Sequence, residues 1–432
     1  MRVLSYNCSL NGFTFGLSRC IIYSKIFFAE RKKQMKISKI ETLRVTIPLE
    51  APILWSQGWR SATTRTLVKV YTDEGIVGIG ETRGDDGIEE MIKGKMAPKL
   101  IGADPFQIEL ILEKFHMLSY FQGYFGLSAV AGVEIALWDI IGKASGRPLC
   151  DLLGGRYRDP ISFSGYIFYR AENNGVGGEK TPEEIVRFCE RVVEEHGFDC
   201  LKLKGGAYPP EHDIEVLRAI RERFGSKFRL RIDPNGCWSP QTAIKVAREL
   251  DEIGLEYLED PVWGIEGMAR LRKDIHIPIA TNMCVVNFDS LPTGIREGAV
   301  DIILADAHKW GGILVTKKLA GVCEAFRIGL SMHSGAELGV STAVNLHLAA
   351  STPQISYSID GHYHHIVDDI IKGGKHKYVN GMIKVPEGPG LGVELDEDKV
   401  GKYHELWASG IEAAANGTFP GAENRHFSRS QF

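Results

Sequence analysis

Three short runs of the sequence decide the fold: RIDPN at 231–235, EYLEDP at 256–261 and PIATNM at 278–283. Each run begins with apolar and β-branched residues, as a buried parallel strand does, and each leads to a side chain that carries oxygen. Those side chains are Asp233, Glu259 and Asn282, which lie 26 and 23 positions apart. A strand, a helix and two loops need a segment of that length, so the spacing predicts consecutive βα units of one parallel sheet.

The same rhythm continues from Pro160 onward. The expected strands are ISFSGYIFY (161–169), CLKLKG (200–205), FRLRID (228–233), LEYLED (255–260), IPIATN (277–282), DIILAD (301–306), GLSMHS (329–334) and ISYSID (355–360). Helical stretches separate them, and one begins with a capping box formed by Thr181 and Glu184. Eight strands and at least seven helices predict a (β/α)8-type barrel over residues 160–385, in which the last helix could be altered.

The segment before the barrel has a different pattern. Residues 36–80 alternate as antiparallel strands do, and residues 88–150 have the periodicity of helices. Strands followed by helices predict an α+β domain, which we place at 35–159. The turn-rich segment 386–432 is expected to return to this first domain, with a frayed tail at 418–432.

Composition restricts the classes of partner. The chain has 432 residues, enough for two domains, with 44% hydrophobic residues and a formal net charge of −4. This charge gives no electrostatic basis for binding nucleic acid or an anionic membrane, and no apolar run reaches the roughly 20 residues that a membrane helix needs. The eight cysteines lie far apart and form no CxxC pair, so we expect reduced thiols and a cytoplasmic location.

The first 34 residues differ from the rest. They contain two broken apolar stretches with scattered basic residues, and no small-residue cleavage site of a signal peptide follows. Met35 then opens a regular alternating strand. The hypothesis is that Met35 is the biological start and that residues 1–34 are a non-native or disordered extension.

The carboxyl ends of barrel strands converge on one mouth, where barrels of this type place their chemistry. Asp233, Glu259 and Asn282 would therefore meet there. Two carboxylates and an amide oxygen form a hard, oxygen-only ligand set that suits Mg²⁺. Glu266, seven residues after Glu259, is an alternative ligand, although its place is expected in the following loop or helix.

Two lysines lie on the second expected strand. Lys202 and Lys204 are two positions apart and so share one face of the strand. If that face is the barrel interior, a neighbouring cation and a second ammonium group disfavour the charged form of a lysine, which suits it to act as a base. A solvated pair at a sheet edge is the alternative for an isolated KxK motif, but the position one βα unit before Asp233 favours the interior.

Two further residues lie at the ends of the sixth and seventh expected strands. Asp306 could hold one ring nitrogen of His333, which would fix the tautomer and raise the basicity of the imidazole. Taken singly, His333 is also consistent with a hydrogen-bonded core histidine, and Asp306 with a helix cap. Lys204 and the His333–Asp306 pair would then face a bound substrate from opposite sides. That arrangement fits removal of a proton from a carbon beside a carboxylate.

The motifs KLKGG, DPNG, EDP, ATNM, LAD and HS, in this order on successive strands, resemble the enolase superfamily. The similarity is greatest to its mandelate racemase-like branch and, within that, to the glucarate dehydratase group, over residues 36–415. The resemblance implies that the N-terminal α+β domain is a capping domain that closes over the barrel, and that Asp233, Glu259 and Asn282 hold Mg²⁺. It also implies Lys204 and His333–Asp306 as the acid–base groups, and Lys202 and Asn235 as supporting polar groups. The amide ligand, in place of a carboxylate, favours the glucarate dehydratase group.

The resemblance also bears on the substrate. GYIF at 165–168 is similar to a segment of that group in which a tyrosine, here Tyr166, contacts the substrate. SQGWRS at 56–61 corresponds to a loop that folds over the ligand, where Arg60 could clamp a carboxylate or could simply be a surface arginine. Ser334 and Lys309 are further candidate substrate-binding residues. GAELG after Ser334 and AHKWGG with Lys309 depart from the glucarate dehydratase pattern, which leaves D-glucarate itself in doubt. The histidines of GHYHH at 361–365 could bind metal, but a loop that lines the substrate or is merely exposed is favoured.

The expected function is a Mg²⁺-dependent dehydratase of an acid sugar, an aldarate or aldonate, that forms a 2-keto-3-deoxy acid. The same pair of opposed bases would also serve a racemase or epimerase of a 2-hydroxy acid. A non-catalytic, metal-stabilised protein on the same scaffold is the third alternative. It predicts the loss of a metal ligand or a base, yet every expected position is filled. We also expect a homo-oligomer, although no segment of the sequence identifies the contact.

Overall fold

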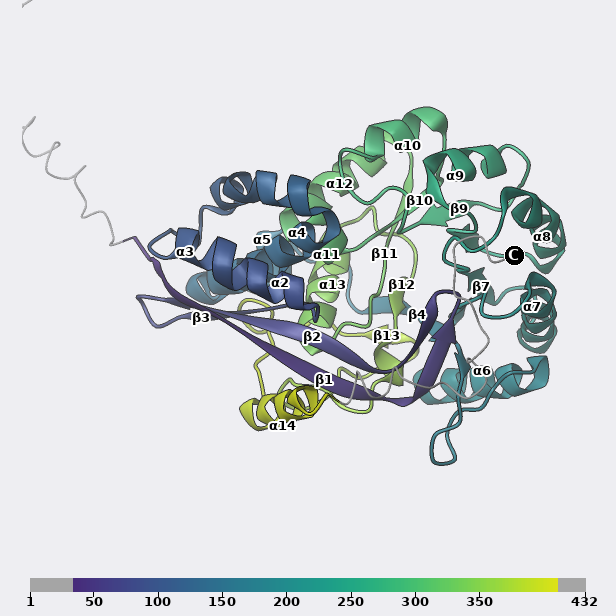
Figure 1. The fold of residues 1–432 in the computed structure, drawn as a ribbon, viewed down its shortest axis with the longest axis horizontal. Coiled ribbons are helices and arrows are strands. Elements are labelled where there is room, and N and C mark those ends of the chain that lie inside the picture. The colour runs from purple at the N-terminus through teal and green to yellow at the C-terminus, as the bar shows by residue number, and fades with distance from the viewer. Residues whose placement is uncertain (1–33, 411–432) are drawn as a thin grey trace, which may run out of the picture.

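The computed structural model describes residues 34–410, which form a parallel barrel and an antiparallel capping sheet with its helices (Figure 1). The expected extension 1–34 lies outside these residues except for Gln34, and the expected frayed tail 418–432 lies outside them entirely.

Eight parallel strands form the barrel, and together with the capping sheet they confirm the predicted fold class. In chain order they are β4 (Ile161–Ile167), β6 (Cys200–Leu203), β7 (Arg229–Ile232), β8 (Tyr257–Glu259), β9 (Ile279–Thr281), β10 (Ile302–Ala305), β11 (Gly329–Met332) and β12 (Ile359–Gly361). Neighbouring strands pair in the order β11-β10-β9-β8-β7-β6-β4-β12. A bridge between Leu330 and Ile355 brings β11 to the segment before β12 and nearly closes the barrel.

Helices cover the outside of the barrel. They are α6 (Pro182–His196), α7 (Pro210–Phe224), α8 (Pro240–Ile253), α9 (Gly264–Arg272), α10 (Leu291–Glu297), α11 (Ala307–Trp310), α12 (Ile313–Phe326) and α13 (Gly339–Ser351). Local sequence fixes several of their ends: Thr181 and Glu184 form the expected capping box of α6, and the Ser239 side chain caps α8. The short 3-10 helix η2 (Tyr363–His365) and the strand β13 (Met382–Ile383) follow β12, so the last βα unit is altered as the sequence allowed.

The capping domain is built on a long antiparallel hairpin. Its strands are β1 (Ile37–Trp55), β2 (Gly58–Thr72) and β3 (Val77–Arg83), and its helices are α2 (Asp86–Met91), the π-helix η1 (Ile92–Met96), α3 (Ala97–Leu100), α4 (Ile108–Ser145) and α5 (Leu149–Leu152). Strand β1 continues past a register shift after Pro48. The two-residue strand β5 (Tyr169–Arg170), which follows β4, pairs with this extension and so joins barrel to cap.

Helix α4 is the core of the capping domain. Its backbone breaks at Gly123, whose φ of 52° lies in the left-handed region that glycine adopts readily. Gly78 and Gly80 of β3 lie against this helix so closely that a Cβ atom would come within 2.0 and 2.1 Å of the carbonyl oxygens of Ala136 and Gly132. The segment Tyr120–Ser145 is long and apolar enough to cross a membrane by length and composition alone, but 83% of its apolar 18-residue window is buried inside the protein, as in a core helix.

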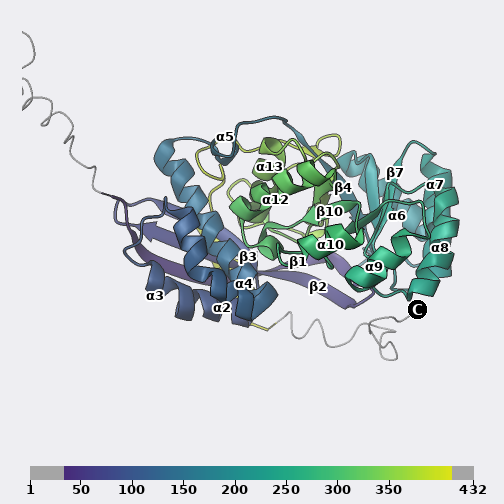
Figure 2. The ribbon, with the colours of Figure 1, turned by 90° about the horizontal axis from the view of Figure 1, so that it is seen from above.

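The last described helix, α14 (Glu397–Ala408), lies against β1 (Figure 1). The Arg44 guanidinium lies 4.1 Å from the ring centroid of Trp407, and Lys69 forms an ion pair with Glu397. Seen from above, β1 and β2 run from the capping helices across to the barrel (Figure 2). The tip of their hairpin contacts the barrel mouth, where the Gln57 side chain donates to the Asn235 carbonyl oxygen at 2.9 Å.

Candidate active site

The three predicted metal ligands lie together at the barrel mouth. Asp233 follows β7, Glu259 ends β8 and Asn282 follows β9, and all three are buried. The Asn282 amide contacts the Glu259 carboxylate, and its Oδ1 accepts a hydrogen bond from Lys309 Nζ at 2.5 Å. The adjacent Asp260 fixes the backbone of this loop by accepting from Asn282 N at 2.8 Å.

This ligand set fits a hard divalent cation. Asp233 and Glu259 bury two carboxylates side by side, and burial together with the charge of Asp233 raises the pKa of Glu259 to about 8. A divalent cation between these groups would offset their repulsion, and carboxylate and amide oxygens are the ligands that Mg²⁺ prefers. Asn235, with φ of 52°, orients Asp233 through hydrogen bonds to both of its carboxylate oxygens, at 2.8 and 3.0 Å.

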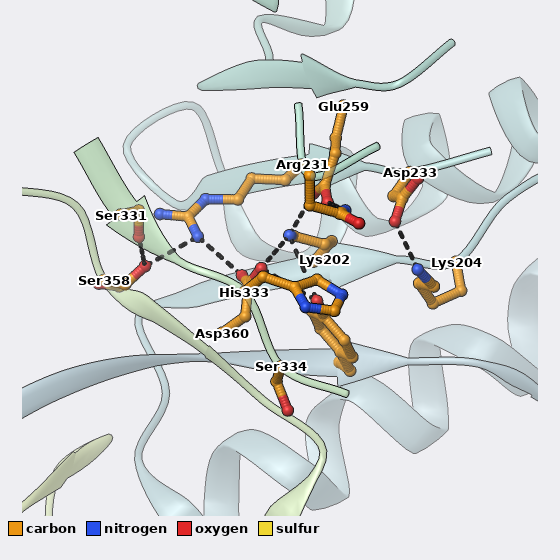
Figure 3. Close-up of polar contacts among 12 residues, drawn as sticks. Lys202, Lys204, Arg231, Asp233, Glu259, Ser331, His333, Ser334, Ser358 and Asp360 are labelled. Atoms are coloured by element: carbon orange, nitrogen blue, oxygen red, sulfur yellow. Dashed lines mark hydrogen bonds and ion pairs between the residues drawn. The ribbon is translucent and has the colours of Figure 1, made fainter. Parts of the chain in front are cut away.

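Lys202 and Lys204 both point into the mouth, as the strand pattern predicted (Figure 3). Lys204 pairs with Asp233, whereas Lys202 pairs with both Glu259 and Asp360. Burial alone would lower the pKa of Lys202, but the charges of Asp360 and Glu259 outweigh it and raise the pKa. With these two carboxylates as its partners, Lys202 is a cation that holds Glu259 and Asp360 in place.

Sequence reasoning missed Asp360 and Arg231 as site residues. Arg231 is fully buried inside the barrel, where it donates to Ser358 O at 3.0 Å and to Asp360 Oδ1 at 3.3 Å (Figure 3). Asp360 is thus shared by Lys202, Arg231 and Tyr166, whose hydroxyl donates to it at 2.9 Å. The available signals were an arginine on the buried strand RLRI and an acid at the end of the eighth strand, the position equivalent to Asp306 on the sixth.

Tyr166, a predicted substrate contact, forms part of the floor of the site. Its ring is fully buried, and Lys202 Nζ and Lys204 Nζ lie 5.0 and 5.4 Å from the ring centroid. The ring also meets that of His362 edge to face, with centroids 4.2 Å apart.

His333 and Asp306 form the predicted pair. His333 Nδ1 lies 3.0 Å from Asp306 Oδ2, which places the other ring nitrogen, Nε2, on the side away from the carboxylate. Burial and the nearby Lys309 ammonium lower the pKa of His333. The carboxylate is also held by a second histidine, His308, whose backbone N–H donates to Asp306 Oδ1 at 2.8 Å and whose Nδ1 lies 3.0 Å from the same oxygen. No motif in the sequence pointed to a functional role for His308.

Ser334, predicted to bind substrate, is buried in a short chain of hydrogen bonds. Its hydroxyl donates to Glu337 Oε2 at 2.6 Å, and its oxygen lies 2.9 Å from His362 Nδ1. Burial, the charge of Arg60 and the charge of Lys204 hold the pKa of His362 well below its usual range, so this ring is neutral. Of the three histidines in GHYHH, His362 is therefore the one that faces the charged groups of the mouth.

His364 and His365 lie behind the site instead. Their Nε2 atoms lie 3.0 and 2.9 Å from the Tyr166 carbonyl oxygen, and both rings pack among aromatic side chains. These contacts indicate a structural role rather than metal binding.

The remaining predicted residues lie around the rim. Arg60 is half-buried near the hairpin tip, with its guanidinium 5.6 Å from the ring centroid of Trp55. Lys309 donates to Asn282 rather than facing solvent, and burial lowers its pKa. Glu266, the alternative ligand, lies exposed in the first turn of α9, in the following helix as expected.

One further cluster has the composition of a metal site. Single ligand atoms of Asp306, His308 and Glu337 lie within 4.8 Å of one another. Each of the three is already hydrogen-bonded: His308 contacts Asp306 through Nδ1 and the Glu81 carbonyl oxygen through Nε2, and Glu337 accepts from Gly335 N and Ser334 Oγ. The cluster is a hydrogen-bond network that supports His333.

Comparison with known proteins agrees with this geometry. Residues 38–154 match the family model of the mandelate racemase / muconate lactonizing enzyme N-terminal domain, and residues 184–399 match that of the enolase C-terminal domain-like family.

Two curated relatives represent different reactions. A probable glucarate dehydratase from Streptomyces coelicolor is 37% identical over 83% of this chain and 89% of its own length. The N-succinyl-L-Arg/Lys racemase of Bacillus cereus is 29% identical over 84% of this chain and 96% of its own length.

Two solved structures share the whole fold. An enolase from Streptomyces coelicolor is 43% identical, with a TM-score of 0.82 over 87% of this chain and 98% of its own. An enolase from Pseudomonas fluorescens, solved with bound magnesium, potassium and tartrate, is 32% identical, with a TM-score of 0.86 over 93% of this chain and all of its own.

Proposed function

Because the chain belongs to the mandelate racemase-like branch of the enolase superfamily and is an enzyme of that superfamily, we propose that it is a Mg²⁺-dependent acid-sugar dehydratase. Its substrate is an aldonate or aldarate, and its product is a 2-keto-3-deoxy acid. The similarity to a probable glucarate dehydratase supports the reaction class.

One observation carries the proposal: two different acid–base groups lie on well-separated strands beside the buried carboxylates. Lys204 follows β6 and His333 follows β11, and the charges of both depress the pKa of His362, which lies near each of them. A substrate at this mouth would have a base on one side and a proton donor on the other, as removal of an α-proton followed by loss of a β-hydroxyl requires.

Each residue then has a stated task. Asp233, Glu259 and Asn282 would hold Mg²⁺, and the chemistry that the bound ion supplies is polarisation of the substrate carboxylate, which makes the adjacent carbon more acidic. Lys202 keeps the Glu259 carboxylate in place.

In the proposed reaction Lys204 removes the α-proton, and His333 gives a proton to the departing β-hydroxyl. Burial and the charge of Lys309 lower the pKa of His333, so its protonated form is a stronger acid and suits that donation. Asp306 holds His333 Nδ1 and so directs Nε2 toward the substrate.

The groups around the mouth suit a small, charged and hydroxylated ligand. Arg60 lies on the capping hairpin, and the neutral ring of His362 lies just before η2. An arginine can bind a distal carboxylate in a bidentate way, and a neutral imidazole can bind a hydroxyl. Both an aldarate and an aldonate are compatible with this set.

The direct test is a screen of the purified protein with Mg²⁺ against a library of aldonates and aldarates, with semicarbazide to detect the keto product. We expect turnover of one or a few sugars, and loss of that turnover in EDTA with recovery on adding Mg²⁺. If Mg²⁺ binds but no sugar gives a keto product, dehydration is wrong.

Racemisation or epimerisation of a 2-hydroxy acid is the second candidate, because the relative from Bacillus cereus is named as a racemase and the same two opposed bases would serve it. The product separates the two reactions. An epimerase would exchange the α-proton with D₂O and return a diastereomer without releasing any keto compound.

A further inference from the structure

His308 links the predicted catalytic pair to the capping domain. Its ring is buried in the first turn of the short helix α11. His308 lies two residues after Asp306, which follows β10 and caps this helix. Nδ1 lies 3.0 Å from Asp306 Oδ1, and Nε2 lies 3.0 Å from the carbonyl oxygen of Glu81, which belongs to strand β3 of the cap.

The partners of its two nitrogens indicate its protonation state. A carboxylate oxygen and a carbonyl oxygen both accept hydrogen bonds and cannot donate them. Each ring nitrogen therefore needs a hydrogen to make a favourable contact, which gives an imidazolium ion. Two other groups lie near Nε2, the Ser341 hydroxyl at 3.2 Å and Arg65 Nη2 at 3.4 Å, both farther away than the carbonyl oxygen.

The charged groups around His308 are paired with one another. Arg65 of β2 donates to Glu81 Oε1 at 2.7 Å, so the guanidinium nearest to the ring is itself paired. Asp306 is the negative group in direct contact with the ring, and Glu337 is close enough to share the cluster. From α4, Tyr124 faces Asp306 as a neutral phenol, because burial and the charge of Asp306 raise its pKa to about 12.

The cap also holds the loop that carries His333. The Glu81 carboxylate accepts from Leu338 N at Oε1 and from Ser341 N at Oε2, both at 2.9 Å, at the start of α13. Thr63 of β2 donates to the Ala336 carbonyl oxygen at 3.0 Å. Asp306 and His333 are thus tied to the same two cap strands, the first through His308 and the second through the loop that follows it.

We propose that His308 is a positioning residue: it is a permanent cation that fixes Asp306 to the capping domain. His308 and His333 then share the negative charge of Asp306. The inference deepens the proposed function, since it concerns the acid–base group that the dehydratase reaction uses. Because Asp306 divides its charge between two rings, it binds the proton of His333 less strongly than it would alone. His308 therefore keeps His333 a weaker base and a better proton donor.

The inference can be tested without substrate. In ¹⁵N-histidine-labelled protein, long-range ¹H–¹⁵N correlation spectra report the protonation of each ring nitrogen, and H308N and H333N identify two of the 13 histidines. We expect both nitrogens of His308 to remain protonated over a pH range in which His333 is neutral. One unprotonated nitrogen on His308 throughout that range would overturn the proposal.

His308→Asn is the informative variant. Its amide can still donate to Asp306 in place of Nδ1, but the positive charge is gone. The pKa of His333 should rise by about one unit, and the limb of the kcat–pH profile that reports His333 should move up with it. A fall in kcat without a shift of this limb or of the NMR titration would mean that His308 is merely structural.

Ser341→Ala is the matched control, since it removes the neutral neighbour of Nε2 and keeps the backbone N–H that Glu81 binds. If Nε2 of His308 instead accepted a hydrogen bond from the Ser341 hydroxyl, this variant would change the His308 signal and H308N would leave His333 unshifted. The proposed function can fail separately: a wild-type protein that turns over no acid sugar contradicts the dehydratase assignment, whereas the NMR titration still decides the role of His308.

Discussion

Lys204 and His333 lie at the carboxyl ends of β6 and β11, but their partners come from different parts of the molecule. Lys204 pairs with Asp233, which follows the neighbouring barrel strand β7. His333 pairs with Asp306, which His308 connects to the Glu81 carbonyl oxygen of the cap. The ion pair of Lys204 is therefore made between barrel residues, whereas the pair of His333 is also held by the docked capping domain.

The largest expected effects are on the two bases themselves. Lys204→Met and His333→Asn should each lower kcat for dehydration by about 10⁴-fold, as loss of an essential acid–base group does. The two variants should differ in exchange of the α-proton with D₂O, measured by NMR. H333N should still exchange it, because Lys204 removes the α-proton in the proposed mechanism, and K204M should not. The reverse pattern would exchange the roles of the two residues.

Asp306→Asn tests the partner rather than the base. The amide can no longer hold the His333 tautomer as a carboxylate does, and we expect kcat to fall by about 10³- to 10⁴-fold. KM should change little, because Asp306 does not face the substrate. A kcat within a few-fold of the wild-type value would remove His333–Asp306 from the mechanism.

Glu81→Gln weakens one of the two links that Glu81 makes between cap and barrel, the one through its carboxylate to Leu338 N and Ser341 N. The substitution leaves the buried Arg65 without its carboxylate and should destabilise the fold by about 3–5 kcal/mol, measured by urea unfolding. In the remaining folded protein, kcat should fall about tenfold, because the loop at 334–338 loses the carboxylate that holds its backbone, whereas the Glu81 carbonyl oxygen that contacts His308 remains. Destabilisation with an unchanged kcat would show that the His333 side does not depend on this carboxylate.

The sequence predicted most of the site residues that the barrel strands carry. Asp233, Glu259 and Asn282 end consecutive strands, and strand periodicity placed Lys202 and Lys204 on the inner face. Strand order is a local property, so residues at strand ends can be placed from spacing alone.

The cap side could not be predicted in the same way. Glu81 lies 227 residues from His308 and 257 from Leu338, and these contacts exist only because two domains dock. His308 gave no pattern, since a histidine in a short loop is compatible with many roles. Arg231 and Asp360 were missed because a buried ion pair across the barrel also joins residues far apart, at a separation of 129.

The smallest expected effect comes from a second carboxylate of the cap, Glu134 on α4, which provides the control for Glu81. It accepts from Ile313 N and Leu314 N at the start of α12, each at 2.9 Å, and from Trp138 Nε1 at 2.8 Å. These donors are neutral and none of these partners contacts Asp306 or His333. Glu134→Gln should therefore destabilise the fold by about 1–3 kcal/mol at pH 5 and leave kcat and its pH profile unchanged.

The pH dependence of this destabilisation has a defined sign. Burial raises the pKa of Glu134 to about 7, from 4.5 in the unfolded chain. Between these values the unfolded state loses the proton while the folded state keeps it, so this group makes the wild type less stable as pH rises, by up to about 3 kcal/mol above pH 7. Glutamine cannot ionise, so the difference in unfolding free energy between wild type and E134Q should shrink from pH 5 to pH 8. A difference that stays constant over this range would mean that Glu134 is already ionised at pH 5, and the two carboxylates of the cap would then differ only in which helix they hold.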